Sequence, residues 1–408
     1  MYIKRHLESR ILDASRYYPV VMVCGQRQVG KSTMLNHIKE ADRKYVTLDD
    51  INARRLAQSD VGLFFETYGN KLLIDEIQRV PSLLIEIKRI VDEKALKGEE
   101  NSGMFWLTGS QKFQMMKSVS ESLAGRVAVF DMAGLSAAEI ENRPEGVFSP
   151  DINDIKKRME FAVKKDIHEV YRDIFRGGMP KVAVSDIDKE RYYADYVSTY
   201  LERDVRDLSQ VGKIGEFYDF LVLLAARTAQ ELKYDEIARA AGVSAPTVKN
   251  WISILECSGI VTILRPYYSN LTNRIVKTPK LYFMDTGLCA YLCRWTDSET
   301  LERGAMDGAF LETYVVSEII KSYYNSGKRP DLFYYRDTEK RELDLIIEKG
   351  DAIYPIEIKK SKTPVRADKN FYVLDKFQKN KKTGIIICLT DELIPYNRDV
   401  WLCPISAI

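Results

Sequence analysis

The stretch that decides the fold is Val20-Val-Met-Val-Cys24, followed by Gly25-Gln-Arg-Gln-Val-Gly30-Lys31-Ser32 and the helical segment Thr33–Glu40. The five apolar residues predict a buried strand, and the loop between strand and helix fits the pattern G-x-x-x-x-G-K-[ST]. Backbone N–H groups of such a loop and of the following helix N-terminus can surround a phosphate. Lys31 would reach the β and γ phosphates, and the Ser32 hydroxyl would bind Mg²⁺. The sequence therefore predicts a nucleotide site with these contact residues: Gly25, Gln26, Arg27, Gln28, Val29, Gly30, Lys31, Ser32 and Thr33.

Acidic and hydroxyl side chains follow the next apolar strands. Leu72-Leu-Ile-Asp75-Glu76 ends in two carboxylates, of which Asp75 suits Mg²⁺ and Glu76 suits polarisation of an attacking water. A further strand ends in Thr108-Gly-Ser110, where either hydroxyl could sense a γ-phosphate. Thr-Gly-Ser is also ordinary turn chemistry, so both interpretations of Ser110 stay open.

Short apolar strands alternate with helical stretches over residues 18–135, a pattern that predicts a parallel α/β sheet. The expected strands are Val20–Cys24, Lys44–Leu48, Lys71–Ile74, Met104–Leu107 and Val127–Met132. Because each is short and apolar throughout, each is expected to be buried on both faces.

Motifs along nearly the whole chain resemble one family, the prokaryotic AAA-type ATPases that carry a C-terminal domain of unknown function, DUF4143. The motifs, in chain order, are Gly25–Ser32, Leu72–Gln78, Leu107–Ser110, Ser122–Arg126, Arg176–Pro180, Tyr200–Asp204, Lys277–Gly287, Gly308–Glu312 and Glu357–Lys359. Gln26 and Ser32 depart slightly from the family, where Ala and Thr are frequent. The resemblance implies an enzyme that hydrolyses ATP with Mg²⁺, and it leaves the biological pathway unassigned.

By the same resemblance Arg126 is expected to act on the γ-phosphate as a finger or sensor. Arginine suits that role because its planar, permanently charged fork spreads over several phosphate oxygens. The sequence does not distinguish action within one subunit from action across an interface, so a homo-oligomer stays open. The alternative is a surface arginine that follows a glycine turn.

Residues 213–283 predict three helices and a strand pair, the arrangement of a winged helix. In a DNA reader the third helix would enter the major groove. That helix would offer the polar side chains of Ser244, Thr247, Lys249 and Asn250. Nine basic and six acidic residues between Lys213 and Phe283 make a weak field for binding duplex phosphates. Winged helices also serve as protein-contact modules or ATPase lids, and that alternative stays open.

Two strands near the C-terminus carry a second set of acidic residues. Glu357 and Lys359 lie two apart and therefore project from one face of a strand, and Asp344 lies on the strand before it. This set resembles the core of PD-(D/E)xK nucleases, in which two carboxylates hold Mg²⁺ and a lysine helps position water. Glu312 matches that fold's additional acidic position. The alternatives are a surface strand with a salt bridge and a nuclease shape kept for binding only.

The predicted organisation has four domains, of α/β class overall. They are a P-loop ATPase domain with a RecA/AAA-like parallel sheet (1–140), a helical lid or connector (141–212), a winged helix (213–285) and a nuclease-like α/β domain (286–408). The expected function is ATP-driven remodelling or processing of DNA. The alternatives are a nucleotide-dependent switch that acts on a protein partner, and an endonuclease licensed by ATP.

Composition narrows the class of protein further. The 408 residues include 61 Lys and Arg against 59 Asp and Glu, which excludes a wholesale polybasic nucleic-acid binder but not a local basic patch. No apolar run approaches the roughly 18 residues of a membrane span, so no membrane partner is expected. Six cysteines without a Cys-x-x-Cys pair and an N-terminus without an apolar signal core favour a cytoplasmic protein.

Overall fold

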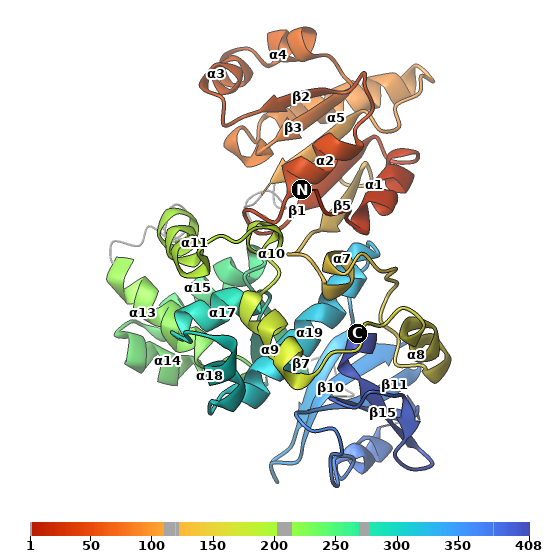
Figure 1. Cartoon of the computed structure of the whole chain (residues 1–408). Helices are drawn as coiled ribbons and strands as arrows, with labels where there is room; N and C mark the ends of the chain where they lie inside the picture. Colours follow the sequence, from red (N-terminus) through yellow and green to blue (C-terminus); the bar gives the residue numbers. More distant parts are fainter. Residues whose placement is uncertain (1, 110–118, 120–121, 202–213, 269–276, 378) are drawn as a thin grey trace. The chain divides into compact units, whose positions relative to one another are not determined.

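A computed structural model describes residues 2–109, 119, 122–201, 214–268, 277–377 and 379–408 of the chain (Figure 1). These residues form two compact units. The first unit is Met1–Leu135 with Cys257–Gly259 and Tyr324–Lys328, and the second is Ser136–Glu256, Ile260–Tyr323 and Arg329–Ile408. Within the described ranges, every helix is too short or too polar to cross a membrane.

The first unit is built on a five-stranded parallel sheet in the order β2-β3-β4-β1-β5, at the red and orange end of the chain in Figure 1. Its strands are β1 (Val20–Cys24), β2 (Lys44–Thr47), β3 (Leu72–Asp75), β4 (Phe105–Gly109) and β5 (Val127–Asp131). Every residue of β1, β3 and β4 is buried, as expected for strands covered on both faces. The same expectation is wrong for the two edge strands, which have a neighbour on one side only: Lys44 and Tyr45 of β2 are exposed, and the residues of β5 are only partly buried. The predicted parallel sheet is confirmed, with strand ends that differ by one or two residues.

Helices precede and connect these strands. They are α1 (Leu7–Ser15), α2 (Lys31–Ile38), α3 (Ile51–Ser59), α4 (Val61–Tyr68) and α5 (Leu83–Leu96), with a short 3₁₀ helix η1 (Ile77–Arg79). Asp50 and Asp60 cap α3 and α4 by accepting bonds from backbone N–H groups inside those helices. Because all five strands are parallel, the segments that follow them emerge at one edge of the sheet.

The second unit begins with helices and ends with a large sheet. Its helices are α7 (Ala137–Ile140), α8 (Ile152–Met159), α9 (Ile167–Arg176), α10 (Pro180–Val184), α11 (Lys189–Tyr196), α13 (Ile214–Ala225), α14 (Tyr234–Ala241), α15 (Ala245–Cys257), α17 (Thr286–Leu292), α18 (Ser298–Arg303) and α19 (Asp307–Asn325), with a π-helical turn η2 (Val197–Leu201). The predicted break at Gly177–Pro180 separates α9 from α10, and the three helices expected after residue 213 are α13, α14 and α15.

Two glycine motifs of this unit pack against each other around Asp285. Gly177 has φ +76°, and a Cβ atom there would lie 2.7 Å from a carboxylate oxygen of Asp285. That carboxylate accepts bonds from the N–H of Gly178 at 2.8 Å, the N–H of Leu288 at 2.7 Å and the Tyr193 hydroxyl at 2.7 Å. The Arg176–Pro180 and Lys277–Gly287 motifs therefore have a structural role in joining the α9–α10 turn to α17.

The sheet of the second unit has ten strands, in the order β14-β15-β13-β11-β10-β9-β7-β8-β6 with β12 beside β11. The strands are β6 (Gln230–Glu231), β7 (Val261–Pro266), β8 (Lys280–Phe283), β9 (Leu332–Arg336), β10 (Glu342–Lys349), β11 (Ala352–Lys359), β12 (Asn380–Lys381), β13 (Gly384–Cys388), β14 (Ile394–Pro395) and β15 (Val400–Pro404). The expected hairpin of β10 and β11 is present, whereas the helix expected near 368–378 is a 3₁₀ helix, η3 (Phe371–Lys376). A last 3₁₀ turn, η4 (Ile405–Ala407), follows β15.

One continuous sheet joins the segments predicted as winged helix and as nuclease-like domain. β7 pairs with β8 on one side and with β9 on the other. Tyr267, directly after β7, is 1% exposed and packs its ring against Phe333 and Phe377. Its hydroxyl donates to Glu348 at 3.2 Å. The predicted boundary at residue 285 thus divides a shared sheet and a shared core, because β7 is held by pairing on both edges.

Candidate functional site

The loop between β1 and α2 needs glycine at both ends of its motif. Gly25 has φ +154°, and a Cβ atom there would lie 2.0 Å from the carbonyl oxygen of Met132. Gly30 has φ +92° and is the N-cap of α2. Both conformations are costly for residues with a side chain. The two glycines therefore allow the backbone to turn back over the strand end, as a phosphate-binding loop requires.

Lys31 lies inside this loop. It is 6% exposed, and its ammonium donates to the carbonyl oxygens of Gly25 at 2.9 Å and Gln26 at 2.7 Å. Burial lowers the pKa of Lys31. Main-chain carbonyls hold the ammonium at the position from which it would reach a phosphate seated on the loop.

Asp75, at the end of β3, is surrounded by hydroxyl groups. One carboxylate oxygen accepts from Ser32 at 2.6 Å and from Thr108, and the other accepts from Tyr45 at 3.1 Å. Burial and the neighbouring Asp75 charge raise the pKa of Tyr45 to about 12, so this phenol remains a donor at neutral pH. The hydroxyls are neutral, so these hydrogen bonds do not cancel the negative charge of the carboxylate, with which the Lys31 cation of the loop interacts electrostatically. A carboxylate with a serine hydroxyl beside it is an all-oxygen set that fits Mg²⁺.

Glu76 follows with a backbone conformation unusual for its type. Its φ of +57° lies in the left-handed region, and its N–H donates to the Thr108 hydroxyl at 3.2 Å. Its carboxylate accepts a bond from the Gln78 amide. The structure thus brings four predicted residues to one edge of the sheet: Lys31, Ser32, Asp75 and Glu76.

Sequence reasoning missed Tyr45 and Arg5 as residues that support this site. The buried Arg5 guanidinium donates to the carbonyl oxygen of Val29 in the loop at 2.9 Å, and to Ala133 after β5 at 2.9 Å. These bonds fix the loop from behind. No local pattern marks either residue, because both act across strands or segments that are distant in sequence.

Arg126 lies at the opposite edge of the same sheet. It directly precedes β5, and its carbonyl oxygen accepts from the N–H of Val20, at the start of β1. The length of β1, roughly 16 Å at about 3.3 Å per residue, separates this position from the phosphate loop. The guanidinium pairs with Asp92 of α5, at 3.0 Å for one nitrogen–oxygen pair. The structure therefore does not bring Arg126 to the phosphate loop of its own chain, and the predicted start of a strand at Val127 already implied this edge. Ser110 lies outside the described residues.

The second predicted carboxylate set comes together on β10 and β11. Asp344 accepts from the Ile358 N–H at 2.9 Å and from the Lys359 ammonium at 3.3 Å. Lys359 also pairs with Glu357 at 2.5 Å. Burial and the Asp344 charge raise the pKa of Glu357 to about 9, whereas the ammonium of Lys359 helps hold the pKa of Asp344 below its usual value. The predicted geometry of these three residues is therefore present, with the lysine ammonium between the two carboxylates.

Glu312 of α19 joins this set through a residue that sequence reasoning missed. Lys280 of β8 is 2% exposed, and its ammonium pairs with Glu312 at 3.1 Å and with Glu342 at 2.5 Å. The Tyr282 hydroxyl donates to Glu312 at 2.7 Å. Burial raises the pKa of Glu312 to about 7, and the nearby Asp344 contributes in the same direction.

Ammonium groups thus face the acidic side chains of this second cluster, and the raised pKa of Glu357, about 9, leaves that side chain protonated at neutral pH. Over the described ranges, no group of three or more His, Cys, Asp or Glu side chains is arranged to hold a metal ion. A divalent ion needs carboxylate oxygens that are free of competing cations. The residues of the nuclease-like set therefore do not fit a Mg²⁺ site in the observed arrangement.

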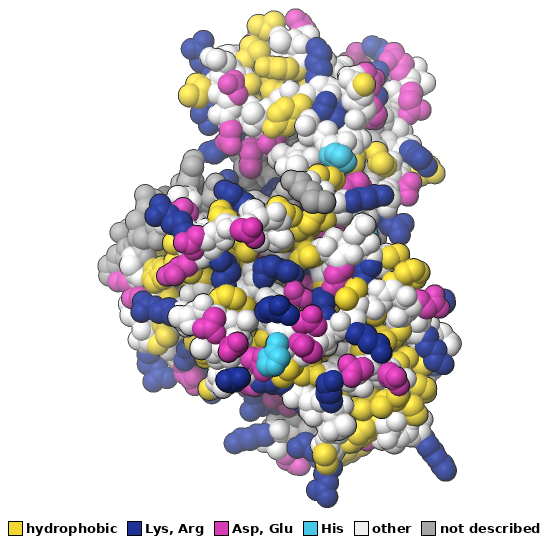
Figure 2. Space-filling view, in the orientation of Figure 1, with side chains coloured by type: hydrophobic (Ala, Val, Ile, Leu, Met, Phe, Trp, Pro, Cys, Tyr) yellow, Lys and Arg dark blue, Asp and Glu magenta, His cyan; other side chains and the backbone are white. Residues whose placement is uncertain are grey.

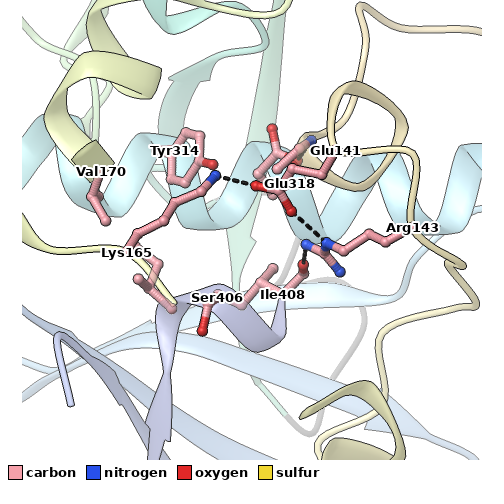
Figure 3. Close-up of a pocket in the computed structure, with 10 residues that line it drawn as sticks. Glu141, Arg143, Lys165, Val170, Tyr314, Glu318, Ser406 and Ile408 are labelled. Atoms are coloured by element: carbon pink, nitrogen blue, oxygen red, sulfur yellow. Dashed lines mark hydrogen bonds and ion pairs between the residues drawn. The ribbon is translucent and has the colours of Figure 1, made fainter. Parts of the chain in front are cut away.

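A third charged group lines a small cavity between α7, α9, α19 and the last residues of the chain (Figure 3). Arg143 donates to the carbonyl oxygen of Ile408 at 2.7 Å and pairs with Glu141 at 2.7 Å, and Lys165 pairs with Glu141 and Asp173. The cavity measures about 10 Å³, close to the volume that one water molecule needs. This network joins elements of the second unit and leaves no room for a substrate.

Comparisons with known proteins agree with the geometry of the first site. Residues 17–141 match the AAA domain family, and residues 307–408 match a domain of unknown function, DUF4143. Residues 167–299 match another domain of unknown function, DUF8612. The matched architecture, an AAA domain followed by DUF4143, is the one that the motifs predicted.

Its relatives include proteins of unassigned role. The uncharacterized proteins Rv2008c of Mycobacterium tuberculosis and Mb2031c of Mycobacterium bovis are each 28% identical over 365 residues, which is 88% of this chain and 75% of theirs. Among solved structures, the Walker-type ATPase PABY2304 of Pyrococcus abyssi aligns with 71% of this chain and 96% of its own, at 15% identity and a TM-score of 0.44. AMPPCP-bound DnaA of Aquifex aeolicus aligns with 61% and 85%, at 16% identity and a TM-score of 0.29.

Proposed function

We propose that this chain is a Mg²⁺-dependent ATPase that uses ATP hydrolysis to remodel or process DNA. The observation that carries the ATPase part is the contact of Ser32 with Asp75 at 2.6 Å, beside a loop that encloses the Lys31 ammonium. These are the parts that a phosphoryl-transfer site of the P-loop class needs at one edge of its sheet.

Each residue of the site has a proposed task. The loop N–H groups and Lys31 bind the β and γ phosphates, while Ser32 and Asp75 hold Mg²⁺, which when bound neutralises charge on the phosphate oxygens. Thr108 and Tyr45 orient the Asp75 carboxylate through their hydroxyls. Glu76 orients the attacking water and accepts its proton, with the Gln78 amide holding the carboxylate.

The DNA part of the proposal is supported by two exposed surfaces of the second unit. Helix α15, with the hairpin of β7 and β8, supports a winged helix, and it exposes Ser244, Lys249 and Asn250. The segment 359–382 contains nine Lys or Arg against two Asp, although the whole chain carries a net charge of only +2. Lys369 and Lys382 of this segment are exposed, and Tyr372 is 53% exposed beside them in sequence.

Elsewhere the two signs of charge are mixed. Figure 2 shows Lys and Arg interspersed with Asp and Glu over the visible face, and several basic side chains projecting at the lower edge of the second unit. A local basic strip, rather than a chain-wide field, is therefore the expected source of attraction for phosphates.

Of the two other functions that the sequence allows, the switch on a protein partner is the second candidate. It is favoured by the pairing of β7 on both edges, which gives the predicted wing less freedom to follow a DNA groove. An endonuclease is less supported, because Glu312 already pairs with Lys280 and Glu357 already pairs with Lys359.

Arg126 is proposed to act across an interface between subunits, since its own phosphate loop lies at the other sheet edge. Lys31→Ala and Arg126→Ala proteins should each be inactive alone. A mixture of the two should recover part of the ATPase rate, because one subunit supplies the loop and its neighbour supplies the arginine. No recovery in a mixture that is shown to assemble would remove Arg126 from the reaction.

The experiment that tests the proposed function is the ATPase rate measured without DNA and with duplex, single-stranded or branched DNA. Stimulation by one form supports DNA action, and an unchanged rate with all forms favours the protein-partner switch. Lys249→Ala and Lys369→Ala should each flatten the salt dependence of DNA binding by about one unit. Lys97→Ala, at the exposed C-cap of α5, is the matched control.

A further inference from the structure

We propose that Lys280 holds the cation position of the nuclease-like carboxylate cluster, so that this unit is a metal-free clamp and not a divalent-metal site. The cluster consists of Glu312, Glu342, Asp344 and Glu357, with the cations Lys280 and Lys359. This inference goes beyond the proposed ATPase and does not depend on nucleotide.

Lys280 is a buried lysine that lies among the carboxylates of this cluster. Its side chain enters from β8 and is 3% exposed. Its ammonium pairs with Glu312 of α19 at 3.1 Å and with Glu342 of β10 at 2.5 Å, and it also interacts electrostatically with Asp344. One compact cation therefore faces carboxylates of α19 and β10, among them Glu312, the additional acidic position of the nuclease resemblance.

Neutral donors bind some of the same carboxylate oxygens that face the lysines. The same Glu312 oxygen that faces Lys280 accepts the Tyr282 hydroxyl, and Asp344 accepts the Ile358 N–H. The second Glu342 oxygen faces the Arg336 guanidinium at 3.5 Å. A divalent ion would have to displace several hydrogen bonds and would meet the ammonium charge at close range.

Lys359 closes the other half of the cluster. Its ammonium lies 3.3 Å from Asp344 and 2.5 Å from Glu357, the two residues that the nuclease resemblance assigns to a metal. The cluster thus contains two lysines beside its acidic side chains, the buried Lys280 and the partly buried Lys359. Through Lys280 the cluster links β8 to α19 and to β10, in addition to the strand pairing that builds the sheet.

The test is a Mn²⁺ titration of the full chain without nucleotide, followed by electron paramagnetic resonance of the free ion. The parent carries Asp75→Asn, which removes the ATPase metal position. We expect the parent to bind no Mn²⁺. The added substitution Lys280→Met should create a site for one Mn²⁺ ion per chain and make the melting temperature rise with Mn²⁺. The control substitution Lys97→Met, at an exposed position, should create no site.

Two results would overturn the proposal. One is Mn²⁺ binding by the parent that a further Asp344→Asn change abolishes, since the native cluster would then be a metal site. The other is a folded Lys280→Met protein that binds no Mn²⁺, since Lys280 would then not be what excludes the ion. If the Lys280→Met protein does not fold, the Mn²⁺ titrations of the parent and of the parent with Asp344→Asn still test the proposal. Absence of Mn²⁺ binding in both proteins supports the metal-free clamp.

Discussion

The two acidic clusters of this chain contain the same chemical group in opposite surroundings. Asp75 is bound by the hydroxyls of Ser32, Thr108 and Tyr45, whereas the cluster around Asp344 is bound by the ammonium groups of Lys280 and Lys359. Hydroxyl donors orient a carboxylate and leave its charge available to an incoming cation. Ammonium groups instead pair with the acidic side chains within the protein and offset their charge.

This difference teaches that an arrangement of carboxylates does not by itself indicate a metal site. A buried carboxylate must be compensated by something, and the compensating group decides what the cluster can do. At Asp75 the compensating cation is left to be supplied with the nucleotide. At Asp344 the chain supplies it from β8 and β11, so the fold resembles a nuclease core while the charge of the cluster is already used.

The largest expected effect is at the phosphate loop. Lys31→Ala should abolish tight ATP binding, because the bound phosphates lose a buried, charged hydrogen-bond donor. Binding of a fluorescent ATP analogue measures this loss, with Lys97→Ala as an exposed lysine control in the same unit. Retained affinity in the Lys31→Ala protein would mean that the first cluster is not the nucleotide site.

Glu76→Gln should separate binding from hydrolysis in that same cluster. The variant keeps the shape of the side chain and its contact with Gln78, so ATP should still bind. Turnover should fall by about 10²–10⁴-fold, because the group that accepts the proton of the attacking water is lost. Single-turnover hydrolysis of labelled ATP checks this, and a normal rate would assign the role to another residue.

In the second cluster the expected effect of a lost lysine is on stability. Lys280→Ala should lower the free energy of unfolding by about 3–5 kcal/mol, because Glu312 and Glu342 would remain buried without their cation. Urea unfolding monitored by circular dichroism measures the change. A loss below about 1 kcal/mol, similar to that of the exposed Lys97→Ala control, would show that the ion pairs of Lys280 contribute little to the stability of the folded chain.

A smaller effect is expected on how the stability of the folded chain depends on pH, and it comes from Glu357 of the second cluster. The pKa of Glu357 is raised to about 9 by burial and Asp344, so the folded chain keeps this proton well above pH 4.5, where the unfolded chain loses it. Folded-state stability from this group is therefore present at low pH and is lost as pH rises towards 9. Glu357→Gln should make stability depend less on pH between 5 and 9. An identical slope in urea unfolding series of both proteins would contradict a protonated Glu357.

Local chemistry explains which parts of this account could be predicted from the sequence. The β1 loop, Asp75 and Glu76 lie on contiguous stretches in which strand, turn and helix N-terminus each have their own signal. Lys280 and Tyr45 carry no such signal, because their partners are brought to them by the pairing of distant strands. Arg126 could be predicted only in part. Its motif indicates a role with phosphate, whereas the strand that begins at Val127 places it at the sheet edge opposite the phosphate loop.

The predicted domain boundary at residue 285 also depends on a contact between segments that are distant in sequence. Periodicity distinguishes the helices before β7 from the strands after α19, and this suggested two modules. The pairing of β7 with β9, in which Arg265 faces Phe333, cannot be read from either segment alone. Only the three-dimensional register reveals that Tyr267 is part of the core that the later strands build.

The most direct test of the central claim is the number of Mn²⁺ ions that the wild-type chain binds together with a non-hydrolysable ATP analogue. We predict one ion per chain, lost in the Asp75→Asn protein and retained in the Asp344→Asn protein. A second ion that Asp344→Asn removes, or a single ion that persists in Asp75→Asn, would contradict it.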